Sequence, residues 1–195
     1  MDPKAQRAHC HQCPLKDAPF VPGDGPGTTG IVIVGRDPGA IEVMEGKPFV
    51  GQAGCLLTRE LGEIGINRSS VHITNTALCH TEGNKKPSVR AVQACHDRLI
   101  GEIKQTGAKK VLALGETASR AVSDRSGAIA VLRLAGPLPS RFLGDDVAVR
   151  VTYHPAWVWR NWKKGHPLFA SDIRTLLDPW AVTSEASASP ENASI

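Results

Sequence analysis

Residues 31–39 read IVIVGRDPG, an apolar run that ends in a turn built from two glycines and a proline. The run is short, rich in β-branched residues and free of alternating polar positions, so it predicts a strand buried on both faces. Similar runs occur in three later stretches, VHITN at 71–75, KKVLALG at 109–115 and VAVRVTY at 147–153. Helical patterns separate or follow these runs at 53–65, 88–107 and 116–124.

Buried strands that alternate with helices form a parallel sheet covered on both sides. The sequence therefore predicts the α/β class, as a three-layer α/β/α domain. Ligands of such domains bind beyond the carboxyl ends of the strands. The loops expected to meet there are 35–39, 74–84, 114–117 and 153–157.

The length of 195 residues predicts one domain over residues 1–180, followed by a small, polar tail at 181–195 that we expect to be disordered. The 23 Lys and Arg residues exceed the 19 Asp and Glu residues, and the net charge of +4 permits a polyanionic partner without requiring one. The chain begins without the apolar core of a signal peptide, and no run approaches the roughly 18 to 20 apolar residues of a membrane span. We therefore expect a cytoplasmic protein with no membrane partner.

Four of the five cysteines are candidate metal ligands. Cys10 and Cys13 form a C-x-x-C pair in a segment rich in proline and glycine, and Cys79 and Cys95 follow far downstream. Four thiolates suit zinc or an iron–sulfur cluster, and the single local pair favours iron–sulfur. The alternative for Cys95 is a place in the buried stripe of a helix, and Cys55, beside leucines, is predicted to be a core residue.

The sequence resembles the family-4 uracil-DNA glycosylases, the iron–sulfur branch of that superfamily. The resemblance is carried, in order, by CHQCPL (10–15), GRDPGAIEVMEGKPFVGQAG (35–54), VHITNTALCHTEGNKKP (71–87), ACHDRL (94–99), KKVLALG (109–115) and VTYHPAWVWR (151–160). It implies a four-stranded sheet with a base pocket at its carboxyl edge. It also implies that Cys10, Cys13, Cys79 and Cys95 ligate a 4Fe-4S cluster.

The resemblance implies a role for each of several pocket residues. His154 would donate a hydrogen bond to the leaving base, Asn75 would read the edge of uracil, and Phe49 would stack on the flipped base. Glu42 and Asn84 match further positions near the pocket. Considered without the resemblance, the histidine suits many structural roles, the asparagine suits a strand end, and the phenylalanine suits the core.

The turn GRDPG departs from the family pattern, in which glutamate and then glycine or alanine usually precede the proline. Here Arg36 and Asp37 stand between Gly35 and the proline. The glycines permit a tight turn and close approach of a ligand to the main chain. A carboxylate at this point can stabilise a cationic sugar and activate water, as the family-1 branch does with an aspartate. The alternative is that Asp37 caps the following helix.

Gly39 keeps the family-4 state, whereas family 1 has a tyrosine there that excludes bases with a 5-methyl group. Gly35, Arg36 and Gly39 are the base-binding candidates of this turn. Uracil is the expected substrate, and a pocket that combines Asp37 with Gly39 makes thymine or another 5-substituted pyrimidine an alternative. The expected enzyme is a monofunctional uracil-DNA glycosylase that leaves an abasic site. A damage-binding protein without turnover is the remaining alternative.

Basic and aromatic residues near both halves of the site predict DNA contacts. Lys85 and Lys86 follow Cys79, while Trp157, Trp159 and Arg160 follow His154. Basic side chains bind phosphates, and an aromatic side chain can fill the gap left by a flipped base. We expect single- or double-stranded DNA containing uracil as the partner of a monomeric protein.

Overall fold

The computed structural model describes residues 4–180, and the tail predicted at 181–195 lies outside them. A four-stranded sheet with the order β2-β1-β3-β4 forms the centre, and all its strand pairs are parallel. The strands are β1 (Ile31–Gly35), β2 (His72–Asn75), β3 (Lys110–Leu114) and β4 (Ala148–Thr152). The four predicted strands and the parallel sheet are confirmed.

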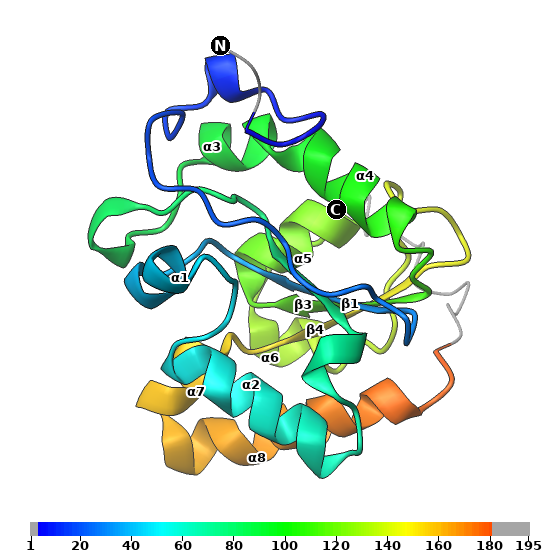
Figure 1. The fold of residues 1–195 in the computed structure, drawn as a ribbon. Helices are drawn as coiled ribbons and strands as arrows, with labels where there is room; N and C mark the ends of the chain where they lie inside the picture. The colour runs from blue at the N-terminus through cyan, green and yellow to red at the C-terminus, as the bar shows by residue number, and fades with distance from the viewer. Residues whose placement is uncertain (1–3, 181–195) are drawn as a thin grey trace, which may run out of the picture.

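Helices cover both faces of the sheet (Figure 1). They are α1 (Ala40–Glu45), α2 (Gln52–Glu63), α3 (Val89–Ala94), α4 (His96–Gln105), α5 (Glu116–Ser123), α6 (Ile129–Leu132), α7 (Pro155–Arg160) and α8 (Trp162–Arg174). Short 3₁₀ turns lie at Cys10–Gln12, Arg68–Ser70, Glu82–Asn84 and Thr175–Leu177.

Two hydrophobic cores follow from the alternation of side chains along each strand. Val32 and Val34 of β1 pack with Leu99 and Ile103 of α4 on one face. The intervening Ile31 and Ile33 pack on the other face with residues of α2 and α8 such as Leu57, Leu61 and Phe169. Successive residues of a strand point to opposite faces, so an unbroken apolar run supplies both cores at once.

The long helix predicted at 88–107 is two helices, α3 and α4, which meet at Cys95. The backbone carbonyl of Ala94 accepts a hydrogen bond from the N–H of His9 in the N-terminal segment. In a continuous helix, this carbonyl would instead accept from the N–H four residues further along. Neither glycine nor proline marks this break, and the helical period continues across it.

The prediction that Cys55 is a core residue is wrong, because its side chain is exposed. The inward face of α2 is made by Leu57 and Leu61, which are fully buried and four residues apart. Cys55 lies off that line and turns toward solvent.

The helices α7 and α8 were not predicted. His154 is the N-cap of α7, and Pro155 occupies the first helical position, where its lack of an N–H is harmless. Within residues 4–180, no helix is both long enough and apolar enough to span a membrane.

Candidate active site

A cavity of about 400 Å³ opens at the carboxyl edge of the sheet. The loops after all four strands contribute to it, as the topology predicts. Its lining includes Arg36, Asp37, Gly39, Glu42, Phe49, Asn75, Asn84, Glu116, Thr117, His154, Trp157 and Arg160. Ten of these twelve were candidate residues in the sequence. Glu116 and Thr117 begin α5, in a stretch that was predicted to reach this edge, although neither was singled out.

Gly35 ends β1 directly beneath the cavity and holds two side chains against its backbone. A β-carbon at this position would stand 2.4 Å from the ring of Phe49 and 2.4 Å from Oδ1 of Asn75. Gly35 and Asn75 are paired in the sheet, which brings these groups together. Gly35 therefore serves the site by having no side chain.

Phe49 has a left-handed backbone, with a φ of 53°. The residue is buried, and its ring centroid lies 5.9 Å from that of His154. Gly54 allows this turn, because a β-carbon there would lie 1.8 Å from the carbonyl oxygen of Phe49. The glutamate Glu42 fixes the same turn, since its Oε1 accepts hydrogen bonds from the N–H groups of Val50 at 3.2 Å and Gly51 at 2.9 Å.

Asn75 ends β2 and is 1% exposed. Its Oδ1 is buried and has no hydrogen-bond partner among residues 4–180. A buried acceptor without a partner is destabilising, and native proteins contain few of them. The side chain therefore holds an unused acceptor at the wall of the cavity.

His154 follows β4, the edge strand on the other side of the sheet from β2, and its ring is neutral. Its Nδ1 accepts a hydrogen bond of 3.2 Å from the N–H of Ala156, so the proton of the neutral ring is on Nε2. Burial, together with the positive charges of Arg36 and Arg160, lowers the pKa of His154 to about 4. The imidazole is thus an uncharged donor at neutral pH.

The side chain of Asp37 is 1% exposed and has two fixed partners. Oδ1 accepts a hydrogen bond from Nε of Arg36, and Oδ2 accepts one of 2.6 Å from the hydroxyl of Thr81. Asp37 is not the cap of α1, because the N-cap is Gly39 and no side chain caps that helix. The capping interpretation is therefore wrong.

Arg36 ties the turn to the loop that follows Cys79. Its Nη2 donates to the carbonyl oxygens of Asn84 at 2.9 Å and Lys85 at 3.3 Å. The hydroxyl of Thr81 also lies within hydrogen-bonding range of the Lys85 carbonyl, and its single proton serves one of its two acceptors at a time. Thr81 was missed in the sequence, because nothing in the chain pattern marks a threonine 44 positions from its partner.

The four candidate cysteines come from three separate segments. Cys10 lies in the first 3₁₀ turn, Cys13 follows it, Cys79 comes after β2, and Cys95 separates α3 from α4. Burial raises the pKa of Cys79 to about 11, a value that includes a lowering by Lys4 and smaller increases from Cys95, Cys13 and Cys10. Burial also raises the pKa of Cys13, with contributions from Cys95 and Cys10. The four sulfurs are therefore electrostatic neighbours.

In the part of the chain that the structure describes, no three Cys, His, Asp or Glu side chains are grouped as ligands of a metal. Thiolates are the ligands of iron–sulfur clusters, so Cys10, Cys13, Cys79 and Cys95 are the residues that would hold one here. The backbone N–H of Lys4 donates to Sγ of Cys10, and that of Leu15 donates to Sγ of Cys13, both at 3.4 Å. Three buried thiols and the partly buried Cys10, two of them with a backbone donor, fit an iron–sulfur group.

The predicted DNA contacts differ in exposure. Trp159 is 50% exposed, and Arg160, Lys85 and Lys86 are also exposed. Trp157 is partly buried and stacks on Tyr153 with ring centroids 4.3 Å apart, so it also forms part of the cavity wall. Lys86 does not line the cavity and forms an ion pair of 3.3 Å with Glu116 at its rim.

These features define an α/β/α protein with a ligand cavity at the carboxyl edge of a parallel sheet. The sequence profile of the uracil DNA glycosylase superfamily matches residues 22–177. The type-4 uracil-DNA glycosylase of Pyrobaculum aerophilum is 38% identical over 165 residues, which cover 78% of this chain and 81% of that protein. The type-4 enzyme of Thermotoga maritima is 36% identical, covering 78% and 79%, and that of Archaeoglobus fulgidus is 34% identical, covering 76% and 77%. The chain belongs to the uracil DNA glycosylase superfamily.

Proposed function

We propose that this protein is a monofunctional uracil-DNA glycosylase that acts as a monomer and leaves an abasic site. Its membership of the superfamily and the names of its relatives support this activity. The observation that carries the proposal is the grouping of Phe49, Asn75 and His154 around one cavity. An aromatic face, an unused amide and a neutral imidazole donor together suit a flat heterocycle with a polar edge.

The base is recognised by stacking and by hydrogen bonds. The ring of Phe49 stacks on the extruded base, a contact that contributes about 1 to 3 kcal/mol. Oδ1 of Asn75 accepts from N3–H of uracil, while the Nδ2 amide donates to O4. The acceptor that has no partner in the free protein obtains one from this substrate. A cytosine presents the opposite pattern at these two positions.

The reaction leaves negative charge on the departing base and positive charge on the sugar. His154 stabilises the first charge, and Asp37 stabilises the second. The electron pair of the bond between C1′ and N1 leaves with uracil, and Nε2–H of His154 donates a hydrogen bond to the base oxygen that becomes anionic. Removal of one such donor slows reactions of this type by about 100-fold or more. Because Nδ1 accepts from the N–H of Ala156, the neutral imidazole carries its one proton on Nε2 and can donate it in this hydrogen bond.

Asp37 acts on the other side of the bond. Its carboxylate stabilises the positive charge on the sugar and accepts a proton from the water whose oxygen bonds to C1′. When Thr81 donates to the carbonyl of Lys85, Oδ2 of Asp37 is free to take that proton. Arg36 holds the other oxygen, so the carboxylate keeps one orientation.

A 4Fe-4S cluster held by Cys10, Cys13, Cys79 and Cys95 joins the N-terminal segment to the loop after β2 and to the start of α4. When bound, it supplies a cross-link among segments that contain few apolar residues. Iron and acid-labile sulfide should be present in anaerobically purified protein and should be lost in Cys79→Ser. The exposed Cys55 gives the control, because Cys55→Ser should keep both. Zinc in place of iron would contradict this assignment.

DNA would approach over the rim of the cavity. Lys85, Lys86 and Arg160 suit contacts with phosphates, and the exposed indole of Trp159 suits the space left in the base stack. The neighbouring Trp157 is packed against Tyr153 and supports the wall of the pocket instead.

A second candidate substrate is a 5-substituted pyrimidine, and Gly39 favours it. The three atoms nearest to a β-carbon at Gly39 would be Oε2 of Glu42, at 2.6 Å, and Oδ1 of Asn84 and Cδ of Glu42, both at 3.7 Å. The nearest neighbours of this position are therefore polar side chains and not an aromatic ring. Thymine or 5-hydroxymethyluracil would then enter where a tyrosine would exclude them.

The test is single-turnover excision from oligonucleotides that contain uracil, thymine opposite guanine, or 5-hydroxymethyluracil. Asp37→Asn should slow uracil excision strongly and preserve DNA binding, whereas Asp145→Asn, on an exposed turn, should behave as wild type. Unchanged excision in Asp37→Asn would remove its catalytic role. Tight binding with no abasic product would support a damage-binding protein instead.

A further inference from the structure

We propose that Arg98 is a positioning residue for base recognition, acting through the backbone of Asn75. This inference rests on the proposed function. Arg98 lies in α4 and is 3% exposed, and it does not line the cavity. It therefore touches neither the base nor the sugar.

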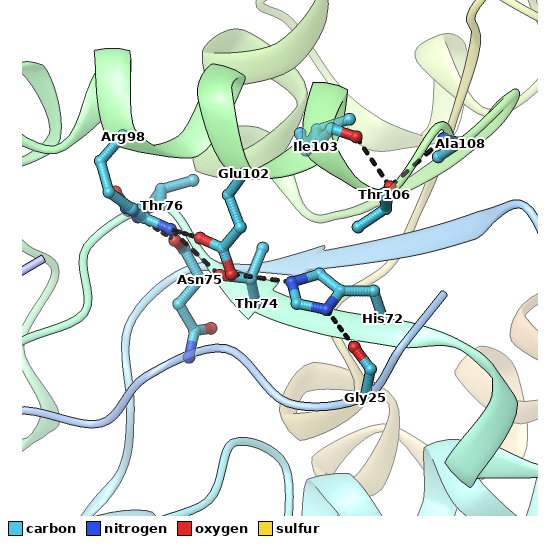
Figure 2. A network of polar contacts seen from close by, with 10 residues as sticks. All are labelled: Gly25, His72, Thr74, Asn75, Thr76, Arg98, Glu102, Ile103, Thr106 and Ala108. Atoms are coloured by element: carbon cyan, nitrogen blue, oxygen red, sulfur yellow. Dashed lines mark hydrogen bonds and ion pairs between the residues drawn. The ribbon is translucent and has the colours of Figure 1, made fainter. Parts of the chain in front are cut away.

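The guanidinium of Arg98 donates hydrogen bonds to three successive residues at the end of β2 (Figure 2). Nη2 donates to the carbonyl oxygen of Asn75 at 2.6 Å and to that of Thr76 at 3.2 Å. Nη1 donates to the hydroxyl of Thr74 at 3.0 Å. Because β2 is an edge strand, these buried carbonyls have no further strand to pair with, and Arg98 supplies their donors.

The side chains of adjacent strand residues point to opposite faces of the sheet. That of Thr74 points toward α4, where it meets Arg98, so the carboxamide of Asn75 points away from α4 and toward Phe49. Figure 2 shows the amide of Asn75 on the far side of its backbone from Arg98. Arg98 can thus orient this amide only by fixing the peptide groups on either side of it.

Arg98 is itself held by Glu102 and His72. Its Nη1 lies 2.6 Å from Oε2 of Glu102, whose Oε1 lies 2.7 Å from Nε2 of His72. Nδ1 of His72 lies 2.6 Å from the carbonyl oxygen of Gly25, so both ring nitrogens face acceptors. The segment at Gly23 closes over this pair, because a β-carbon there would stand 2.0 Å from Oε1 of Glu102. The guanidinium of Arg98 is therefore held by Glu102 as well as by the end of β2.

A positioned amide is sensitive to small movements, because a recognition group must stay within about 0.5 Å of its productive place. Arg98→Met removes the donors and keeps an apolar chain of similar length. We expect it to slow single-turnover excision of uracil by about tenfold or more. A factor of this size lies within the range of interaction energies measured between residues of one hydrogen-bond network. Free uracil should also inhibit Arg98→Met less strongly than wild type.

The decisive experiment is a double-mutant cycle with Asn75→Leu. If Arg98 acts through the amide, Arg98→Met should have little further effect on excision in the Asn75→Leu background. Leu99→Ala gives the control, because Leu99 is a fully buried neighbour on the same helix and its loss lowers stability without touching the β2 carbonyls. Its effect should be the same in both backgrounds.

Equal effects of Arg98→Met in the two backgrounds would overturn the inference. If Arg98→Met does not fold, Arg98→Lys, which keeps the charge but not the forked geometry, enters the same cycle with the same expected outcome. Failure of wild-type protein to excise uracil would instead refute the proposed function. The two failures are therefore distinguishable.

Discussion

Replacing Asn75 with leucine should raise the stability of the free protein while it slows uracil excision. Asn75 is 1% exposed, and its Oδ1 has no hydrogen-bond partner in the described part of the chain. A buried polar group left without a partner costs about 1 to 3 kcal/mol. Leucine has nearly the same shape and no polar atom, so it removes this penalty without leaving a cavity.

The size of both effects follows from the same atoms. Each kcal/mol shifts the melting temperature of a domain of this size by about 2 to 4 °C, so we expect a rise of roughly 2 °C or more. In the complex, two hydrogen bonds of about 0.5 to 1.5 kcal/mol each are lost, and the polar edge of uracil is left unpaired at about 1 to 3 kcal/mol. These losses total about 2 to 6 kcal/mol, and at about 1.36 kcal/mol per decade excision should slow by roughly 30-fold or more.

Thermal unfolding and single-turnover excision, measured on the same preparations, test this prediction. Asn67→Leu is the control: Oδ1 of Asn67 accepts from both the N–H and the hydroxyl of Ser69, so its loss should lower stability and leave excision unchanged. A variant at Asn75 that melts lower than wild type and still excises uracil at the wild-type rate would refute the reasoning.

Three further predictions concern the site and its support. Since the pKa of His154 is about 4, the rate of excision should show no inflection near pH 6.5, and an inflection there in a pH–rate profile would contradict a neutral donor. Gly35→Ala should slow excision with a modest loss of stability, because the added methyl displaces both Phe49 and Asn75; wild-type rates would show that the contacts yield freely. Burial opposes the charge on His72, but its hydrogen bonds to Glu102 and to the Gly25 carbonyl raise its pKa. Protonated His72 therefore stabilises the folded protein fully below about pH 6.5, the ordinary pKa of histidine. This stabilisation is lost as the pH rises through the raised pKa. The unfolding free energy of wild type should accordingly fall more between pH 6 and 9 than that of His72→Gln, and parallel curves from denaturant titrations would refute this contribution.

The strands and the location of the site could be predicted because local pattern determines them. The apolar runs define β1 to β4, and parallel pairing then brings their carboxyl-end loops together at one edge. Asn75 ends β2, Asp37 and His154 follow β1 and β4, and all three line one cavity. Their shared location depends only on topology, which the order of strands and helices indicates.

The features that were missed depend on partners distant in the chain. The break at Cys95 depends on a hydrogen bond from His9 to Ala94, and the role of Thr81 depends on a carboxylate 44 positions away. Arg98 lies in a stretch that supports the family resemblance, but a helical arginine is ordinarily a surface residue, and nothing local shows that this one is buried. Long-range polar contacts of this kind leave no periodic signal.

Largely buried arginine–carboxylate pairs lie next to the two strands whose ends hold the proposed base contacts. Arg98 and Glu102 lie behind the end of β2, and on β4 the hydroxyl of Thr152 donates at 2.5 Å to Asp172, which also pairs with Arg133 at 2.6 Å. Buried ion pairs add little net stability, because desolvation offsets their attraction, so packed apolar residues would hold these strands at least as firmly. These pairs instead fix the orientation of the groups that they bind, because the forked guanidinium holds its acceptors at set angles. A site that must hold the amide of Asn75 and the neutral imidazole of His154 around one cavity needs fixed geometry at both strand ends more than it needs additional stability.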